Sequence, residues 1–270
     1  MKKPKPGRAW YFVDEAGDPN FYNSHGKLIV GTTGCSPILA LGFMQTPNPD
    51  PIRHAVSQLQ HNIVNDVYFQ NIPSIAKTAR MFHAKDDIPE VRYLFFKLIA
   101  QLDIRAHIIV ARKIEHVFLN YDHAKPHNFY DFVVSQLFHN VLHLHEENHI
   151  YFAKRQSRTR QAPFVAAIAR GRRKFEAYCK SPITTTFEAQ AQTPVGEPCL
   201  SVIDYLIWSV YRAYTTNDMR YFNTVRDKIR LIGDIFDFDR KPKNWYNQNN
   251  PFDIKKVTPL QLVPSEGHTA

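Results

Sequence analysis

Near its start the chain reads Trp10-Tyr11-Phe12-Val13-Asp14-Glu15-Ala16-Gly17-Asp18-Pro19. The first four residues are aromatic or β-branched, which predicts a buried strand. The turn-forming residues from Gly17 onward end it. Neighbouring strand residues point to opposite faces, so only one of the two adjacent acids faces inward, and we expect this to be Asp14. A plain strand end with two solvated carboxylates explains the same pattern equally well.

The composition is that of a folded protein with a sizeable core. The chain has 270 residues, of which 44% are hydrophobic and 13% aromatic. We expect a basic N-terminal tail over residues 1–7, a single domain over residues 8–238, and a tail rich in Pro, Asn and Lys over residues 239–270. The tail is either docked in part by its aromatic residues or disordered.

The sequence also bears on the compartment of the protein. No apolar run approaches the ~20 residues that a membrane span needs, so no membrane association is expected. The basic N-terminus is not followed by the apolar core of a signal peptide. The three cysteines are far apart and include no Cys-x-x-Cys pair, which favours a reducing, cytoplasmic location.

The charge favours a polyanionic partner, such as DNA or RNA. The sequence has 34 Lys and Arg residues against 25 Asp and Glu, a formal net charge of +9. Many of these cations follow a predicted strand and continue into a predicted helix, with no acid before Glu176. They are Lys154, Arg155, Arg158, Arg160, Arg170, Arg172, Arg173 and Lys174. Phosphate contact is the natural use of such a cluster, and a solvated helix face is the alternative.

The periodicity predicts an α/β fold. Strands are expected at residues 28–33 and 38–44, which with the first strand would form a three-stranded antiparallel meander, and at 106–111, 150–153 and 184–189. Helices are expected at residues 50–63, 89–102, 129–144, 163–178, 200–214 and 219–236. This order predicts a mixed sheet, the meander plus parallel strands, flanked by helices.

A second acid stands out in the apolar segment Cys199-Leu200-Ser201-Val202-Ile203-Asp204-Tyr205-Leu206-Ile207-Trp208. Asp204 is the only charged residue between Glu197 and Arg212. A helix that is apolar nearly all round packs deep in a fold, where a carboxylate needs a cation, hydrogen bonds or a metal ion. An ion pair with Arg212 or with the basic helix and a metal or catalytic role both remain open.

A third candidate lies in the stretch Phe82-His83-Ala84-Lys85-Asp86-Asp87. His83 and Asp86 are of the types that ligate metal ions or move protons. Alternatively, the two acids merely favour the N-terminus of the helix that follows Pro89.

Together, residues 12–18, 82–86 and 199–205 resemble the bacterial DUF3800 family, whose function is unknown and which looks like a branch of the RNase H-like superfamily. The resemblance covers residues 8–235. It implies an RNase H-like fold, in which acids from the first strand, a middle element and a late helix hold divalent metal ions.

Carried over by position, the resemblance gives each candidate a role. Asp14 and Asp204 would be the core ligands of Mg²⁺ or Mn²⁺. The catalytic candidates are Asp14, Glu15, Asp204 and His83, and the metal ligands are Asp14, Asp204, Asp18 and Asp86. Candidates for nucleic-acid contacts are Lys85, Lys154, Arg155, Arg158, Arg160, Arg172 and Arg173.

The chain departs from the family pattern in three places. Ala16 replaces the usual Ser, and Ser201 stands where Gln is common. Lys154-Arg155-Gln156 follows the strand at residues 150–153, where the family often has an Asp. The middle acid would then come from Asp86 or Glu188, or else the protein binds one metal ion or has no catalytic site.

These observations give one hypothesis and its alternatives. We expect a divalent-metal-dependent nuclease or phosphodiesterase acting on nucleic acid, with bacterial defence or a mobile element as its context. The main alternative is a non-catalytic subunit that binds nucleic acid, or a protein partner through its C-terminal tail. A hydrolase of small phosphate esters is a third.

Overall fold

Seven strands form one mixed sheet in the order β5-β4-β1-β2-β3-β6-β7. The computed structural model describes residues 5–121, 125–154 and 161–260. The strands are β1 (Lys5–Gly17), β2 (Ile38–Thr46), β3 (Arg105–Arg112), β4 (His145–Ala153), β5 (Thr186–Gln192), β6 (Ile229–Asp234) and β7 (Trp245–Tyr246).

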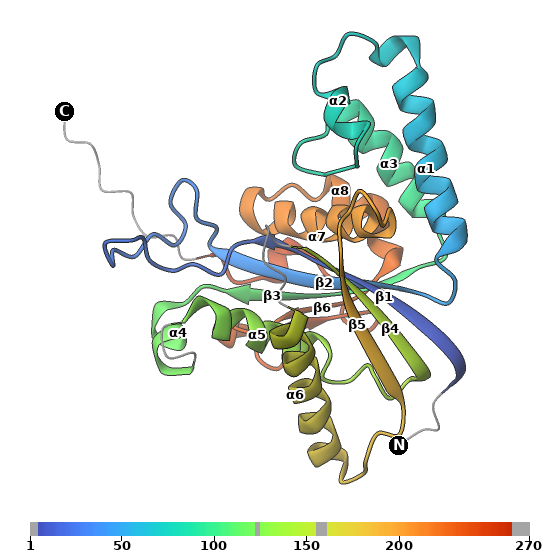
Figure 1. Ribbon diagram of the computed structural model, residues 1–270. Coiled ribbons are helices and arrows are strands. Elements are labelled where there is room, and N and C mark those ends of the chain that lie inside the picture. Colours follow the sequence, from blue (N-terminus) through green and yellow to red (C-terminus); the bar gives the residue numbers. More distant parts are fainter. Residues whose placement is uncertain (1–4, 122–124, 155–160, 261–270) are drawn as a thin grey trace, which may run out of the picture.

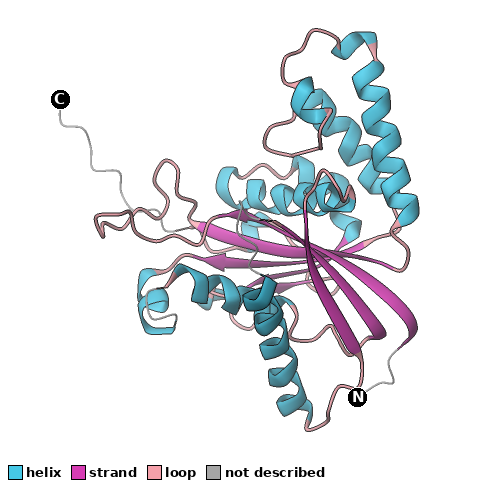
Figure 2. Cartoon of the chain, viewed as in Figure 1, coloured by secondary structure: helices cyan, strands magenta, loops and turns pink. Residues whose placement is uncertain are grey.

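Helices cover both faces of this sheet (Figure 1 and Figure 2). One face carries α1 (Asp50–Asn65), α2 (Ile75–Thr78), α3 (Pro89–Gln101), α7 (Cys199–Thr216) and α8 (Arg220–Val225), and the other carries α4 (Glu115–Tyr121), α5 (Pro126–Leu137) and α6 (Gln161–Cys179). Short 3₁₀ turns are η1 (Val67–Phe69), η2 (Arg226–Lys228), η3 (Phe238–Arg240) and η4 (Ile254–Lys256). In the described part of the chain, none of the helices has both the length and the apolar character of a membrane span.

The sheet combines antiparallel and parallel pairing around β1. Strand β1 pairs with β2 and β2 with β3, both antiparallel, which gives a three-stranded antiparallel meander, though not of the predicted segments. On the other side of β1, β4 pairs with it in parallel, and β5 pairs in parallel with β4. Beyond β3, the sheet continues with β6 in parallel and β7 antiparallel. The predicted mixed sheet flanked by helices is therefore confirmed.

One of the three segments predicted for the meander is not a strand. Residues 28–33 form turns with one isolated bridge, between Tyr22 and Leu28, and β3 takes the place in the sheet. The prediction failed because this apolar run has two following threonines and flanking glycines, and its backbone closes on itself through Gly31 and Cys35. A helical excursion, α1 to α3, separates β2 from β3.

The C-terminal third also differs from the prediction. The helix expected over residues 219–236 ends at Val225, and residues 229–234 form β6. Residues 239–260 follow the sheet edge instead of extending from it, and Tyr246, Phe252 and Val257 are buried there. The ring of Phe252 contacts those of Tyr214 and Phe222, so the aromatic residues of this segment dock it. Residues 1–4 and 261–270 lie outside the described residues.

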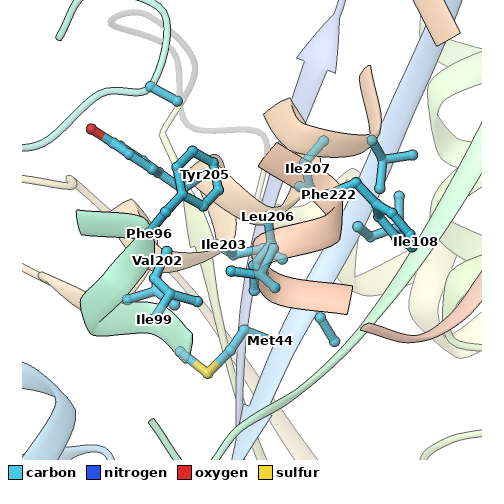
Figure 3. Close-up of a cluster of buried hydrophobic side chains, with 14 of the residues drawn as sticks. Met44, Phe96, Ile99, Ile108, Val202, Ile203, Tyr205, Leu206, Ile207 and Phe222 are labelled. Atoms are coloured by element: carbon cyan, nitrogen blue, oxygen red, sulfur yellow. The ribbon is translucent and has the colours of Figure 1, made fainter. Parts of the chain in front are cut away.

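Helix α7 is the centre of one of the two cores. Twelve of its 18 residues are buried, which explains why its sequence is apolar nearly all round. Figure 3 shows its side chains between those of the sheet, such as Met44 and Ile108, and those of α3, such as Phe96. The helix ends at Asn217, which adopts the left-handed conformation (φ 56°) common at helix ends.

The close approach of α7 to the sheet depends on Gly42 in β2. A Cβ atom there would lie 2.9 Å from the carbonyl oxygen of His107 and 3.1 Å from Cγ1 of Ile207 in α7. We expect Gly42→Ala to lower the free energy of unfolding by about 1–3 kcal/mol, because the helix and the neighbouring strand must both shift. Urea denaturation measures this.

The matched control for this substitution is Gly196→Ala. A Cβ atom at Gly196 would meet only atoms of Thr193, the nearest at 3.3 Å. Equal stability of the Gly42→Ala protein and the wild type would show that α7 does not need this contact distance.

Candidate functional site

Strand β1 directs Asp14 and Glu15 to opposite faces of the sheet. Its pairing with β2 continues without interruption from Trp10 to Gly17, so no bulge brings the two acids together. Asp14 lies opposite Gly42, on the face that α7 covers. Glu15 accepts a hydrogen bond from the hydroxyl of Tyr130 in α5, at 3.2 Å, on the other face. The structure therefore does not bring Glu15 together with Asp14.

Asp18 is also separate from Asp14. Its Oδ2 accepts a hydrogen bond from the backbone nitrogen of Ser36 at 3.1 Å, and its Oδ1 lies 3.3 Å from Nζ of the buried Lys113. These contacts fix the turn after β1 against the start of β2. Because its carboxylate is occupied by this ion pair, the expectation that Asp18 is a metal ligand is not supported.

Helix α7 and the turn at residues 82–87 are held together by three hydrogen bonds. Ser201 Oγ donates to the carbonyl oxygen of Phe82 at 2.9 Å, and the backbone nitrogen of Ala84 donates to Asp204 Oδ2 at 2.7 Å. Tyr205 Oη donates to Asp87 Oδ2 at 2.6 Å. Two stretches singled out in the sequence, about 120 residues apart, are thus brought into contact.

Asp87 has a structural role in this contact. It is 3% exposed, and its two oxygens also accept hydrogen bonds from Thr78 Oγ1 at 2.6 Å and from the backbone nitrogen of His83 at 2.8 Å. With Tyr205 as a third donor, the carboxylate is fully used. Asp87 therefore closes the turn and anchors it to α7.

His83 and Asp86 lie on the outer side of the same turn. Nδ1 of His83 is 3.6 Å from Asp86 Oδ2, an ion-pair distance when the imidazole is protonated. Lys77 Nζ approaches the same oxygen at 3.5 Å. Both side chains are partly exposed, so they remain accessible to a substrate or to solvent.

Asp204 carries a charge that its surroundings do not neutralise. No Lys or Arg of the described residues lies within ion-pair distance of it, and the predicted partner Arg212 pairs with Asp218 instead. Desolvation, together with the charges of Asp87 and Asp86, raises the pKa of Asp204 to about 6, although His83 and the hydrogen bond from the Ala84 N–H act to lower it. This environment favours a bound proton or cation.

Of the two acids considered for the middle position, Asp86 is the one near Asp204. Asp86 contributes to the electrostatic environment of Asp204, whereas Glu188 lies exposed on β5, 3.9 Å from His149. Within residues 5–121, 125–154 and 161–260, however, no three His, Cys, Asp or Glu side chains gather closely enough to hold a metal ion. A metal site here would need additional ligands from a substrate or water.

The predicted phosphate-binding residues separate into two groups. Lys85 in the turn and Lys154 after β4 are exposed. Arg172 is not available, because its guanidinium binds Glu176 at 3.2 Å and the carbonyl oxygens of Thr185 and Ile183. Arg173 is exposed on α6, which covers the face of the sheet opposite to α7. Arg155, Arg158 and Arg160 lie outside the described residues.

Some contacts of the site carried no recognisable signal in the sequence. Ser201 and Tyr205 anchor the turn, yet a Ser and a Tyr in an apolar helix are ordinary core residues. The available clue was the position of Ser201, three residues before Asp204 and four before Tyr205. Residues at these spacings lie along one side of a helix.

Comparison with known proteins finds no protein-family model and no curated protein that matches this sequence.

The charge on Asp204 makes a testable contribution to stability. Its pKa is about 6 in the folded protein and near 3.8 when unperturbed, so the folded chain retains a proton that the unfolded chain releases as the pH rises from about 4 to 6. The ionised carboxylate of Asp204 therefore lowers the free energy of unfolding above pH 6. We expect Asp204→Asn to raise the free energy of unfolding by about 1–3 kcal/mol at pH 7 and to have little effect below pH 4.

Asp218→Asn is the control with the opposite sign. Hydrogen bonds from Arg220 lower the pKa of Asp218 to about 2, so its charge stabilises the fold above pH 4 and this substitution should cost stability there. Denaturation curves at several pH values compare the two. A destabilised Asp204→Asn protein at pH 7 would mean that the ionised carboxylate is structurally paired.

Proposed function

We propose that this protein is a divalent-metal-dependent nuclease or phosphodiesterase with Asp14 and Asp204 at its centre. The observation that carries the proposal is the uncompensated carboxylate of Asp204. It lies on the helix that packs against β1 and β2, and β1 directs Asp14 to the same face. Two carboxylates from different elements on one face are suited to a divalent cation that also binds phosphate.

The strand arrangement supports an RNase H-like assignment. Strands β1, β2 and β3 form the antiparallel meander, β4 and β5 run parallel on the other side of β1, and a long helix after β5 supplies the late acid. The resemblance to the DUF3800 family implies acids on the first strand and on a late helix, and Asp14 in β1 and Asp204 in α7 hold these positions. Strands β6 and β7 extend the sheet beyond β3.

The donor set fits a cation that is held jointly with the substrate. Mg²⁺ is usually bound by one or two carboxylates, with waters and substrate phosphates as the other ligands. Asp14 and Asp204 match that requirement, with Asp86 close to Asp204. Such an ion would polarise a phosphoryl oxygen and increase the acidity of a water molecule.

The protein's own side chains have supporting roles in this proposal. The Ala84 N–H and α7 fix the carboxylate of Asp204, since both belong to well-packed backbone. His83 is partly exposed beside Asp86, where an imidazole can transfer a proton. Lys85 and Lys154 are exposed and can bind phosphates flanking the scissile bond.

Calorimetric titration of Mn²⁺ tests the joint site. With short DNA or RNA present, we expect wild-type protein to bind Mn²⁺ at least about tenfold more tightly than without it. Asp14→Asn and Asp204→Asn should each remove that gain and abolish cleavage of the same oligonucleotides. Glu188→Gln, a matched change of an exposed acid on β5, should leave both the gain in Mn²⁺ affinity and the cleavage activity unchanged.

The same titration separates the alternative function. A non-catalytic nucleic-acid-binding subunit is favoured by the lack of a three-ligand group among the described side chains. It would bind DNA or RNA equally well with and without Mn²⁺, and in both Asp variants. That result would refute the nuclease proposal and leave nucleic acid as a binding partner of a non-catalytic protein.

The salt dependence of nucleic-acid binding identifies the contact face. Each lost phosphate contact lowers the slope of log K against log salt by about 0.9 for duplex DNA. We expect the double variant Lys85→Ala/Lys154→Ala to lower the slope by about 2. Both side chains are exposed: Lys85 follows Ala84, which donates to Asp204, and Lys154 follows β4, which pairs in parallel with β1.

Two α6 variants serve as controls. Arg173→Ala should leave the slope unchanged, since α6 lies on the opposite face. Arg172→Ala should lower thermal stability without changing the slope, because its hydrogen bonds are internal. A reduced slope for Arg173→Ala alone would move the nucleic acid to the α6 face.

A further inference from the structure

Helix α7 reaches solvent along a single stripe. Twelve of its 18 residues are buried, and the residues that are partly exposed follow one another at helical spacing. They are Asp204, Trp208, Tyr211, Arg212 and Thr215. At 1.5 Å per residue, Trp208 and Arg212 lie about 6 and 12 Å from Asp204 along the helix axis. The stripe therefore connects the candidate acid with an aromatic ring and a cation.

Two guanidinium groups lie over the ring of Trp208. The central carbon of Arg92, in α3, is 5.2 Å from the ring centroid, and that of Arg212 is 5.6 Å from it. The ring of Tyr221 in α8 contacts the indole edge-on, with 4.7 Å between the centroids. A guanidinium that lies over an aromatic ring keeps the N–H groups at its edge available for hydrogen bonds. Trp208 thus positions two arginines from different helices.

Each of these guanidiniums has a terminal nitrogen that is accessible and has no hydrogen-bond partner among the described residues. Arg92 donates through Nη1 to the carbonyl oxygen of Ala84 at 3.0 Å, which leaves its Nη2. Arg212 approaches Asp218 through Nη2 at 3.5 Å, which leaves its Nη1. The Nε atoms of both arginines are buried, whereas these two Nη atoms are not. A ligand outside the protein can therefore reach one donor nitrogen of each.

The charges around Trp208 favour an anion. Asp218 is the acid within ion-pair distance of Arg212, and Arg220 holds the same carboxylate more closely, at 2.8 Å. Arg92 has no Asp or Glu of the described chain within ion-pair distance, because its contacts are with a carbonyl oxygen and a ring. Three guanidiniums thus share one carboxylate. Asp204 is negative, so an anion is favoured at the Trp208 end of the stripe.

We propose that Arg92 and Arg212, positioned by Trp208, bind phosphate groups of a nucleic-acid strand that runs along α7 from Asp204. This inference rests on the proposed function, because it extends the substrate contacts of the Asp204 site. Ala84 links the two parts: its N–H donates to Asp204, and its carbonyl oxygen accepts from Arg92. Guanidiniums are suited to phosphate oxygens, and a strand presents several phosphates at once. A strand should therefore bind more tightly than a single phosphate group.

Fluorescence anisotropy of labelled oligothymidylate and oligouridylate with the full chain tests the proposal. EDTA is present, so that no divalent cation contributes to binding. We expect Arg92→Gln/Arg212→Gln to weaken binding of the preferred oligonucleotide at least about tenfold. The slope of log K against log salt should fall by about 1.4, at about 0.7 for each phosphate contact with a single strand. Thymidine monophosphate or inorganic phosphate that competes as well as unlabelled oligothymidylate would overturn the proposed strand.

Arg212→Gln alone is an independent test. Arg92 also holds the turn at Ala84, so its loss can lower the stability of the double variant. Arg212 makes no such contact, and Asp218 keeps its ion pair with Arg220 when Arg212 is replaced. We expect Arg212→Gln to fold as the wild type does, by circular dichroism, and to lower the salt slope by about 0.7. A slope equal to that of the wild type in this variant would overturn the site.

The control is Arg230→Gln/Arg240→Gln, which removes the same charge from exposed residues outside the stripe. We expect its salt slope to equal that of the wild type, and an equal loss in this control would refute the site by showing an effect of overall charge.

The Mn²⁺ titration described above separates this site from the proposed activity. Weaker binding by the Arg92 and Arg212 variants, with no Mn²⁺ gain in the wild type, would support the strand site and refute the metal-dependent nuclease. Cleavage that needs Mn²⁺, with equal oligonucleotide binding by the wild type and these variants, would support the nuclease and refute the strand site.

Discussion

The approach of α7 to the sheet at Gly42 is the contact on which the rest of the structure depends. A side chain at this position would collide with β3 and with Ile207, so the helix can lie directly on β1 and β2 only because none is present. The face of α7 away from the sheet then packs on α3 through Tyr205, whose ring contacts those of Phe95 and Phe96. The helix is thus enclosed on both sides, which explains its apolar sequence.

Enclosure of α7 also determines the chemistry of Asp204. Packing around α7 desolvates the carboxylate of Asp204, which accepts a hydrogen bond from the backbone nitrogen of Ala84. Asp87, in the same turn, accepts hydrogen bonds from three donors, which stabilise its carboxylate. Two acids of the same cluster therefore differ in role: Asp87 stabilises the turn, whereas the ionised form of Asp204 costs stability. Such a cost is typical of functional sites.

The candidate acids Asp14 and Asp204 and the basic helix α6 lie on different faces of the sheet. The α7 face holds Asp14 and Asp204, and the opposite face holds Glu15 and the basic helix α6. Part of the basic cluster is internal, because Arg172 ties α6 to the segment before β5. The net positive charge of the chain thus does not by itself define a nucleic-acid surface.

The sequence alone determined the local features of this protein. Aromatic and β-branched residues before Asp14 predicted β1 and the inward direction of Asp14, and the apolar run around Asp204 predicted a deeply packed helix, because strand alternation and helical burial are local properties. Only the tertiary structure decided which segments pair. Residues 28–33 have the composition of a strand but turn back on themselves, and residues 229–234 were predicted as helix but complete the sheet beside β3. The meeting of Ala84 with Asp204 and the ion pair of Asp18 with Lys113 depend on long-range packing, which no pattern within either segment contains.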